Sequence, residues 1–382
     1  MKIFSSDTVA EKESYHAFID GLRGIAILLV VLAHSYYALL GVDAQFKWSY
    51  TPGLLDSGQR GVQLFFMLSA FTLYNSSAVP FHKDKYPYLD FYIRRAFRIL
   101  PFYWVMCVFW FYFFYHYNVA RLLSSVLFYF GFIPGGGLVP GASTIFAEET
   151  FYIMLPILFV YVHNISRAVW LLLATFALSR AWLLYADGSK VLQKGEFHNV
   201  FAFNQWWCFA LGILIYYIFT NTFFKEKLVN NKYFGWGITI AAILASVNYF
   251  RYNVVLSVIS LSILFVASIP AGTLFGRIAR NKVLIKFGGY CYSIYFVHFL
   301  VIEYLKPYRD GILHFLRLNP YPLEVQIGAM FIIFSTISLG IAYFTFHLVE
   351  KPCVQYGKRF IPRVNTIADM LKEKRVDLPP EN

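Results

Sequence analysis

The stretch DGLRGIAILLVVLAHSYYALL, residues 20–40, is an apolar run that carries two ionisable side chains inside it, Arg23 and His34. On a helix, their spacing is about 20° off three full turns and roughly 16 Å of rise, so both side chains lie on one face at different depths. A run of this length and apolarity can span a bilayer. An ionisable residue inside a span is costly and is a candidate functional residue. The alternative for His34 is a structural histidine that is hydrogen-bonded to a neighbouring helix.

The composition places the whole chain in a membrane. Of its 382 residues, 58% are hydrophobic and only 14% are charged, and the mean hydropathy is positive. These values predict an all-α, polytopic membrane bundle rather than a soluble domain. The net charge of +12 is carried by short loops and a tail. Contact with membrane lipid explains that distribution better than nucleic-acid binding does. No metal site is predicted, because neither metal-ligand spacing nor a disulfide framework is present in the four cysteines, Cys107, Cys208, Cys291 and Cys353.

Eleven apolar segments follow one another along the chain. The segment 119–133 is short and we interpret it as re-entrant or interfacial, which leaves about ten spans. With both termini in the cytoplasm, the cytoplasmic segments hold 23 of the 33 Lys and Arg residues, and this bias favours that orientation. The expected parts are a cytoplasmic segment 1–17, a transmembrane domain 18–352 and a basic cytoplasmic tail 353–382. The apolar segments are 22–40, 61–78, 97–117, 119–133, 145–162, 168–185, 202–220, 234–250, 253–271, 288–305 and 324–347.

A cluster of arginines precedes the third apolar segment, within FYIRRAFRILPFYW. Arg95 and Arg98 are one helical turn apart with Arg94 beside them, and guanidinium groups bind phosphate oxygens in a bidentate manner. A positively charged membrane anchor is the simpler interpretation of such a cluster. Arg23 is expected on the same cytoplasmic side, where phosphate-bearing donors are found, and Asp20 is spaced to pair with it. The shared side favours a phosphate-binding site.

Other ionisable residues lie in or beside later segments. Glu148 and Glu149 begin the fifth span, which the charge bias places at the outer face. They suggest an acid/base pair or a site that hydrogen-bonds a polyol, while a solvated helix N-terminus is the alternative. His298 lies within a later span, where packing or hydrogen bonding is the commoner role. Glu350 ends the last span and is expected to pair with a cytoplasmic arginine.

These stretches together resemble the acyltransferase-3 family of integral membrane acyltransferases. The first resemblance is the arginine–ten residues–histidine pattern of Arg23 and His34. Four further stretches agree with the family in the same order, so that the resemblance runs from Phe18 to Pro352. They are GVQLFFMLSAF, RRAFRILPFYW, EETFYIMLP, and YSIYFVHF followed by VEKP.

The chain also departs from the family pattern at a few positions. Gln63 stands where the family usually has Asp, and Ala70 where it has Gly. The residues 143–146 replace a Trp-Ser-Leu that usually precedes the glutamates. These departures concern acceptor specificity more than the chemistry. Ser69 and Tyr152 lie inside matching stretches and are further candidate site residues.

The resemblance implies transfer of an acyl group, commonly acetyl from cytoplasmic acetyl-CoA, to a hydroxyl of a carbohydrate or glycolipid such as O-antigen lipopolysaccharide or another surface polysaccharide. It also implies a bacterial cytoplasmic (inner) membrane. The arginines, above all Arg95 and Arg98, would hold the donor phosphates. His34 would act as the general base, with Arg23 as its positional partner and Glu149 as a further catalytic candidate. A covalent acyl-histidine is the variant mechanism.

Two other functions fit the same residues. A proton-coupled transporter or flippase would use His34 and Glu149 in a proton relay and would move its substrate without consuming acyl-CoA. A non-catalytic membrane subunit would use the basic cluster only as an anchor and would tolerate His34→Ala.

Overall fold

The computed structural model describes residues 9–40, 58–81, 85–115, 118–134, 137–193, 197–221, 237–238, 240–241 and 254–376. Every regular element in these ranges is a helix, which confirms the all-α prediction. The long helices are α1 (Val9–Leu40), α3 (Gly61–Phe81), α4 (Pro87–Phe113), α6 (Ala142–Tyr161), α7 (Ile165–Asp187), α10 (Ala202–Thr220), α13 (Val254–Ser268), α16 (Cys291–Leu305), α18 (Leu323–Thr345) and α19 (Lys351–Val376).

Shorter helical pieces connect these helices. They are η1 (Gly58–Arg60), α5 (Val119–Val126), η2 (Tyr129–Phe132), α8 (Lys190–Gln193), α9 (Phe197–Val200), α14 (Leu274–Ala279), α15 (Lys282–Gly289), η5 (Lys306–Tyr308), α17 (Arg309–Phe315) and the π-helical turn η6 (Phe346–Glu350). The expectation that 119–133 does not span is consistent with its two short helices, α5 and η2.

Six helical stretches in the described ranges are long and apolar enough to cross a membrane. Helix α15 and the helical run that begins at Cys291 are bent by 80° relative to each other. If these two together form one span, there are seven. The predicted number of about ten is therefore not confirmed. The six are His16–Leu40, Pro87–Phe113, Ala142–Tyr161, Ile165–Asp187, Phe197–Thr220 and Leu323–Ile367.

Two further expected spans correspond to described helices that are not among the six. One of them is α3. Helix α13 has 15 residues, which is short for a span. The expected segment at 234–250 lies almost wholly outside the described residues.

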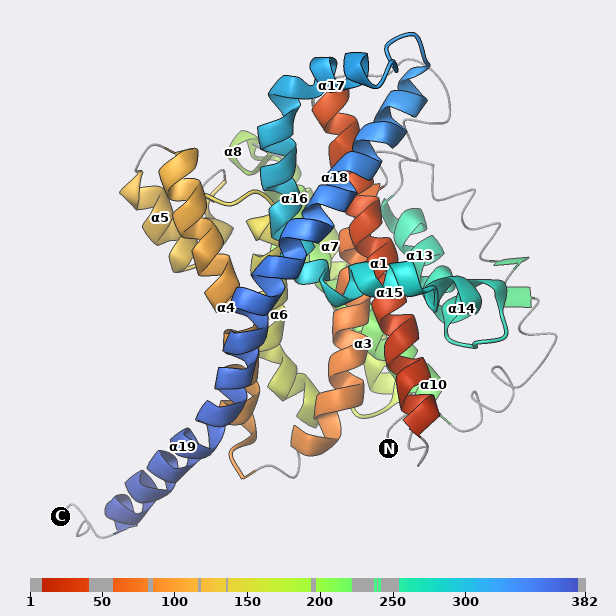
Figure 1. Ribbon diagram of the computed structural model, residues 1–382. Helices are drawn as coiled ribbons and strands as arrows, with labels where there is room; N and C mark the ends of the chain where they lie inside the picture. The colour runs from red at the N-terminus through yellow and green to blue at the C-terminus, as the bar shows by residue number, and fades with distance from the viewer. Residues whose placement is uncertain are drawn as a thin grey trace.

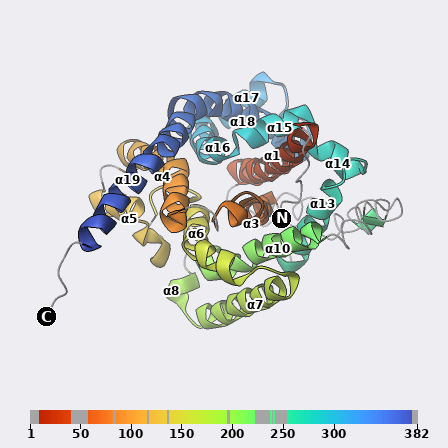
Figure 2. The same cartoon turned by 90° about the horizontal axis from the view of Figure 1, so that it is seen from below.

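Helix α1 packs against α3, α15, α16 and α18, and α3 is surrounded by α1, α6 and α10 (Figures 1 and 2). The crossing of α1 and α15 is unusually close because glycines line it. A Cβ atom on Gly24 would lie 2.0 Å from the Leu284 carbonyl oxygen. A Cβ atom on Gly288 would lie 1.6 Å from the backbone carbonyl oxygen of Asp20. This close crossing fixes the start of α16 beside the lower half of α1.

The last helix, α19, packs along α4 and then projects away from the bundle (Figure 1). Phe97 of α4 packs against the rings of Tyr356 and Phe360. Further out, Lys85 Nζ is 2.6 Å from Asp369 Oδ1. Helix α1 begins and α19 ends at the same end of the bundle (Figure 1).

Candidate functional site

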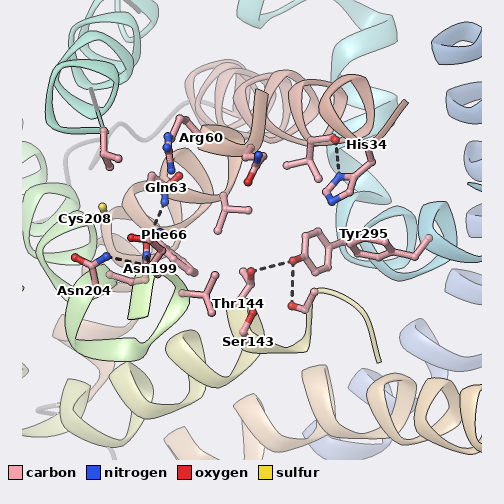
Figure 3. A pocket seen from close by; sticks show the side chains of 18 of the residues that line it. His34, Arg60, Gln63, Phe66, Ser143, Thr144, Asn199, Asn204, Cys208 and Tyr295 are labelled. Carbon is pink, nitrogen blue, oxygen red and sulfur yellow. Dashed lines mark hydrogen bonds between the residues drawn. The ribbon is translucent and has the colours of Figure 1, made fainter. Parts of the chain in front are cut away.

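His34 borders a cavity of about 590 Å³ in the interior of the bundle. The cavity lies among α1, α3, α10, α16 and the turn that precedes α6. His34 and Tyr295 lie on one side of it, and Arg60, Gln63 and Asn204 lie on the other (Figure 3). A cavity of this size can hold a small organic ligand.

The hydrogen bonds of His34 determine which of its nitrogens is available. Nδ1 lies 2.8 Å from the Val30 carbonyl oxygen. A carbonyl can only accept, so Nδ1 carries the proton and donates it. The neutral ring therefore has its lone pair on Nε2. His34 thus has the form that a general base requires.

A second histidine lies against the first. The His298 ring is 5.1 Å from the His34 ring, centroid to centroid, and its side chain is fully buried. His298 Nδ1 donates to the Ile294 carbonyl oxygen at 3.1 Å, and its buried Nε2 has no hydrogen-bond partner within the described part of the chain. Phe299 packs on both rings. The structure therefore brings together two histidines that the sequence separates widely.

Tyr295 closes the same side of the cavity. Its hydroxyl donates to the Gly141 carbonyl at 3.1 Å and lies 2.9 Å from Thr144 Oγ1, with which it shares a second hydrogen bond (Figure 3). Gly141 has a left-handed backbone with a φ of +75°, and a Cβ there would lie 2.7 Å from Phe299 and from the Tyr295 hydroxyl. Glycine is therefore required at this turn for both reasons.

The predicted residues Ser69, Glu148, Tyr152 and Arg95 meet in one partly buried cluster. Ser69 Oγ donates to Glu148 Oε1 at 2.9 Å. The Tyr152 hydroxyl also donates to Glu148 and lies 2.6 Å from Ser69 Oγ. The Arg95 guanidinium lies over the Tyr152 ring, 5.9 Å from its centroid. Oε1 of Glu148 thus accepts two hydrogen bonds, and the carboxylate attracts the charge of Arg95.

This cluster brings together residues for which the sequence predicted different sides. The sequence places Glu148 at the outer face and Arg95 at the cytoplasmic mouth. In the structure both lie against the side chain of Tyr152, Glu148 through a hydrogen bond and Arg95 over the ring.

A second polar cluster lies at the start of α16. Ser293 Oγ donates to Glu350 Oε2 at 3.0 Å, and Arg98 is electrostatically attracted to the same carboxylate. Arg23 Nη1 lies 3.1 Å from Asp20 Oδ1, as predicted. The charges of Arg23, Arg98, Asp20 and Glu350 all act on Cys291, so these residues lie around it. The sequence predicted that Glu350 pairs with a cytoplasmic arginine. The attraction between Glu350 and Arg98 agrees with that prediction.

Three predicted residues lie outside the cavity lining, as the other residues of the two clusters do. Glu149 Oε1 is buried and has no hydrogen-bond partner among the described residues, and Arg94 is half-buried. Arg23 is partly exposed beside Asp20. Of the predicted catalytic residues, His34 alone is among the described residues that line the cavity.

A family model described as an acyltransferase domain matches residues 16–346. The chain belongs to the acyltransferase-3 family. Comparisons with curated proteins and with solved structures find no match. Membership makes this protein a membrane acyltransferase, and the matched range includes His34, the arginines of both clusters and the cavity.

Several lining residues of this acyltransferase were missed from the sequence. Asn204 and Gln205 lie in the apolar segment 202–220 and face the cavity. Polar residues inside a span are candidate functional residues, so this signal was available. Arg60 directly precedes the apolar segment 61–78 and shows no signal of its own in the sequence. It reaches the cavity because η1 packs against α1, a contact that the sequence does not reveal.

Proposed function

We propose that this acyltransferase transfers an acyl group, in the simplest case acetyl, from cytoplasmic acyl-CoA to a hydroxyl of a carbohydrate acceptor. The bacterial cytoplasmic membrane is the proposed location. The observation that carries the proposal is the state of His34: its Nδ1–H is bound to Val30, and its ring borders a cavity of ligand size.

The proposed reaction needs one base and no further reactant. His34 Nε2 takes the proton of the acceptor hydroxyl while the oxygen attacks the thioester carbonyl. The C–S bond breaks, and the proton passes from the imidazolium to the leaving CoA thiolate, so that an ester and free CoA result. A general base of this kind contributes about 10²–10⁴ in rate.

The arginines support a donor site on the other side of the histidines. Arg95 and Arg98 are half-buried and each has a carboxylate close by, Glu148 and Glu350 respectively. Such carboxylates hold the guanidinium groups in place. Guanidinium groups held in this way suit the diphosphate of CoA. Arg23, near Arg98 around Cys291, would add a third positive charge.

The test of the base is acetyl transfer by the purified protein, supplied with labelled acetyl-CoA and with carbohydrate extracted from the surface of its host cell. We expect His34→Ala to abolish detectable transfer and to leave acetyl-CoA binding intact. His347→Ala is the matched control, because His347 Nδ1 also lies 2.8 Å from a carbonyl one turn earlier, that of Tyr343, but its ring lies outside the cavity lining. Wild-type turnover in folded His34→Ala would refute the mechanism.

The donor site has its own test. Arg95→Ala or Arg98→Ala should each weaken acyl-CoA binding by about 1–3 kcal/mol, the typical loss of a charged hydrogen bond. Arg359→Ala on the exposed face of α19 is the control, because it removes the same charge from a helix that leaves the bundle. Unchanged affinity in the first two variants would favour a lipid anchor instead.

A further inference from the structure

The side of the cavity opposite His34 is a wall of amides with one positive charge. Gln63 of α3 and Gln205 of α10 meet there, and Arg60 of η1 lies beside them (Figure 3). This wall takes no part in the proposed proton transfer. Its hydrogen bonds and its charge indicate what it recognises.

The amide orientations are fixed by a chain of hydrogen bonds. Gln205 Nε2 donates to the Asn199 carbonyl oxygen at 2.6 Å. Because that oxygen can only accept, Gln205 must turn its own Oε1 the other way, where it accepts from Gln63 Nε2 at 3.0 Å. Gln63 Oε1 then has no partner within the described residues, although the side chain is only 6% exposed.

An unpaired buried oxygen of this kind is uncommon. Leaving an acceptor buried without a bond costs about 1–3 kcal/mol, and most such groups in folded proteins are paired. Gln63 borders the cavity, so a ligand hydroxyl that enters beside it and shifts the side chain slightly can supply the missing donor. The orientation therefore specifies a hydrogen-bond donor at this point of the acceptor.

The charge in the cavity has one sign. Among its described lining residues there is no Asp or Glu, and Arg60 is the one permanently charged side chain. No carboxylate of the described ranges pairs with Arg60. A guanidinium group inside a membrane protein is stabilised by an anion, and its planar fork fits a carboxylate or a phosphate.

We infer that the Arg60–Gln63 side of the cavity binds the acceptor and selects a carbohydrate that carries a carboxylate or a phosphate. Arg60 contacts the anionic group, Gln63 Oε1 accepts from a sugar hydroxyl, and another hydroxyl of the same acceptor faces His34. The inference rests on the proposed function, since it takes His34 as the reacting end. The aromatic rings of Phe66 and Trp207 also line the cavity.

Calorimetric titration of the purified full chain in detergent tests the selectivity directly. The probes are methyl glucuronide, glucose 1-phosphate and the neutral methyl glucoside. We expect at least one anionic probe to bind about 10- to 100-fold more tightly than the neutral one, the range of a charge-assisted contact. Preference for the glucuronide identifies a carboxylate, and preference for the phosphate identifies a phosphoryl group. Equal binding of all three, or no measurable binding of any, would overturn the inference.

Substitutions distinguish the contact made by Arg60 from the contact made by Gln63. Arg60→Gln should remove the anionic preference and leave binding of methyl glucoside unchanged, and Arg60→Lys should retain part of it. Gln63→Met should weaken the binding of all three probes by a similar factor. Arg121→Gln is the control, because Arg121 lies over the Tyr115 ring, outside the cavity. An anionic preference that survives Arg60→Gln in folded protein would also overturn the inference.

Acetyl transfer distinguishes failure of this inference from failure of the proposed function. If transfer to surface carbohydrate requires His34 but its KM is unchanged in Arg60→Gln, the acceptor assignment alone is wrong. If the anionic probes bind through Arg60 but no acetyl is transferred, the proposed function alone is wrong. An Arg60→Gln variant with a raised KM and an unchanged kcat supports both.

Discussion

Gly288→Ala tests the close crossing of α1 and α15, on which the position of the whole site depends. The added Cβ would lie 1.6 Å from the Asp20 carbonyl oxygen, with the Asp20 carbonyl carbon at 2.5 Å. Ordinary contact between such atoms needs about 3.5 Å, so the two backbones must separate by roughly 2 Å. Both partners are helix backbone and neither can rotate away as a side chain can.

The expected loss has two parts. Overpacking of this kind costs about 1–3 kcal/mol, or more where backbone opposes backbone. Asp20 also holds Arg23 at 3.1 Å, so displacement of α1 moves the charges at the start of α16. A misplacement of about 1 Å can cost about 10²-fold in rate. We therefore expect a lower melting temperature together with weaker acetyl transfer.

Gly289→Ala is the matched control, because a Cβ on Gly289 would meet no atom within 4 Å. Neither glycine has a positive φ, so both substitutions restrict the unfolded chain equally. The assays are thermal melting of the purified protein and acetyl transfer from labelled acetyl-CoA. If the two variants melt within about one degree of each other and transfer at the same rate, the reasoning from the helix crossing is refuted.

Three further changes test other contacts. Tyr152→Phe keeps the ring beneath Arg95 but removes the hydroxyl that binds Glu148; acyl-CoA affinity should fall about 3- to 10-fold, the effect of one hydrogen bond, and an unchanged titration would contradict this. His298→Leu removes a buried nitrogen that has no partner; transfer should stay within about threefold of wild type, and a loss of about 10²-fold would make His298 catalytic instead. Arg309→Leu removes the donor to the Ala38 and Leu39 carbonyl oxygens at the end of α1; it should cost about 1–3 kcal/mol of stability, and an unaltered melting temperature would show that this cap is dispensable.

Local sequence patterns were enough to predict much of the structure of α1. Apolarity predicted the span, and helical spacing predicted that Arg23 pairs with Asp20, as it does at 3.1 Å. The all-α class followed from composition. These features depend on residues within a few helical turns of one another, which is the range over which sequence periodicity is informative.

The rest depends on how distant helices pack. The contact of His34 with His298 joins α1 to α16, and the Ser69–Glu148 bond joins α3 to α6. No periodicity within one helix carries that information. Charge bias likewise does not predict that Glu148 and Arg95 meet at Tyr152, because it assigns loop ends to a side but does not say which residues of different helices come together.

The π-helical turn Phe346–Glu350 separates two helical phases in the last helical run. A π turn holds one residue more than an α turn, so α19 is rotated by about 100° relative to a straight continuation of α18. Residues on α18 can therefore face α16 and α1 while those on α19 face α4. Deletion of one residue from this turn would put both helices into a single phase, and Glu350 would then no longer face Ser293. The length of this turn is thus as strict a requirement of the fold as the identity of any side chain in it.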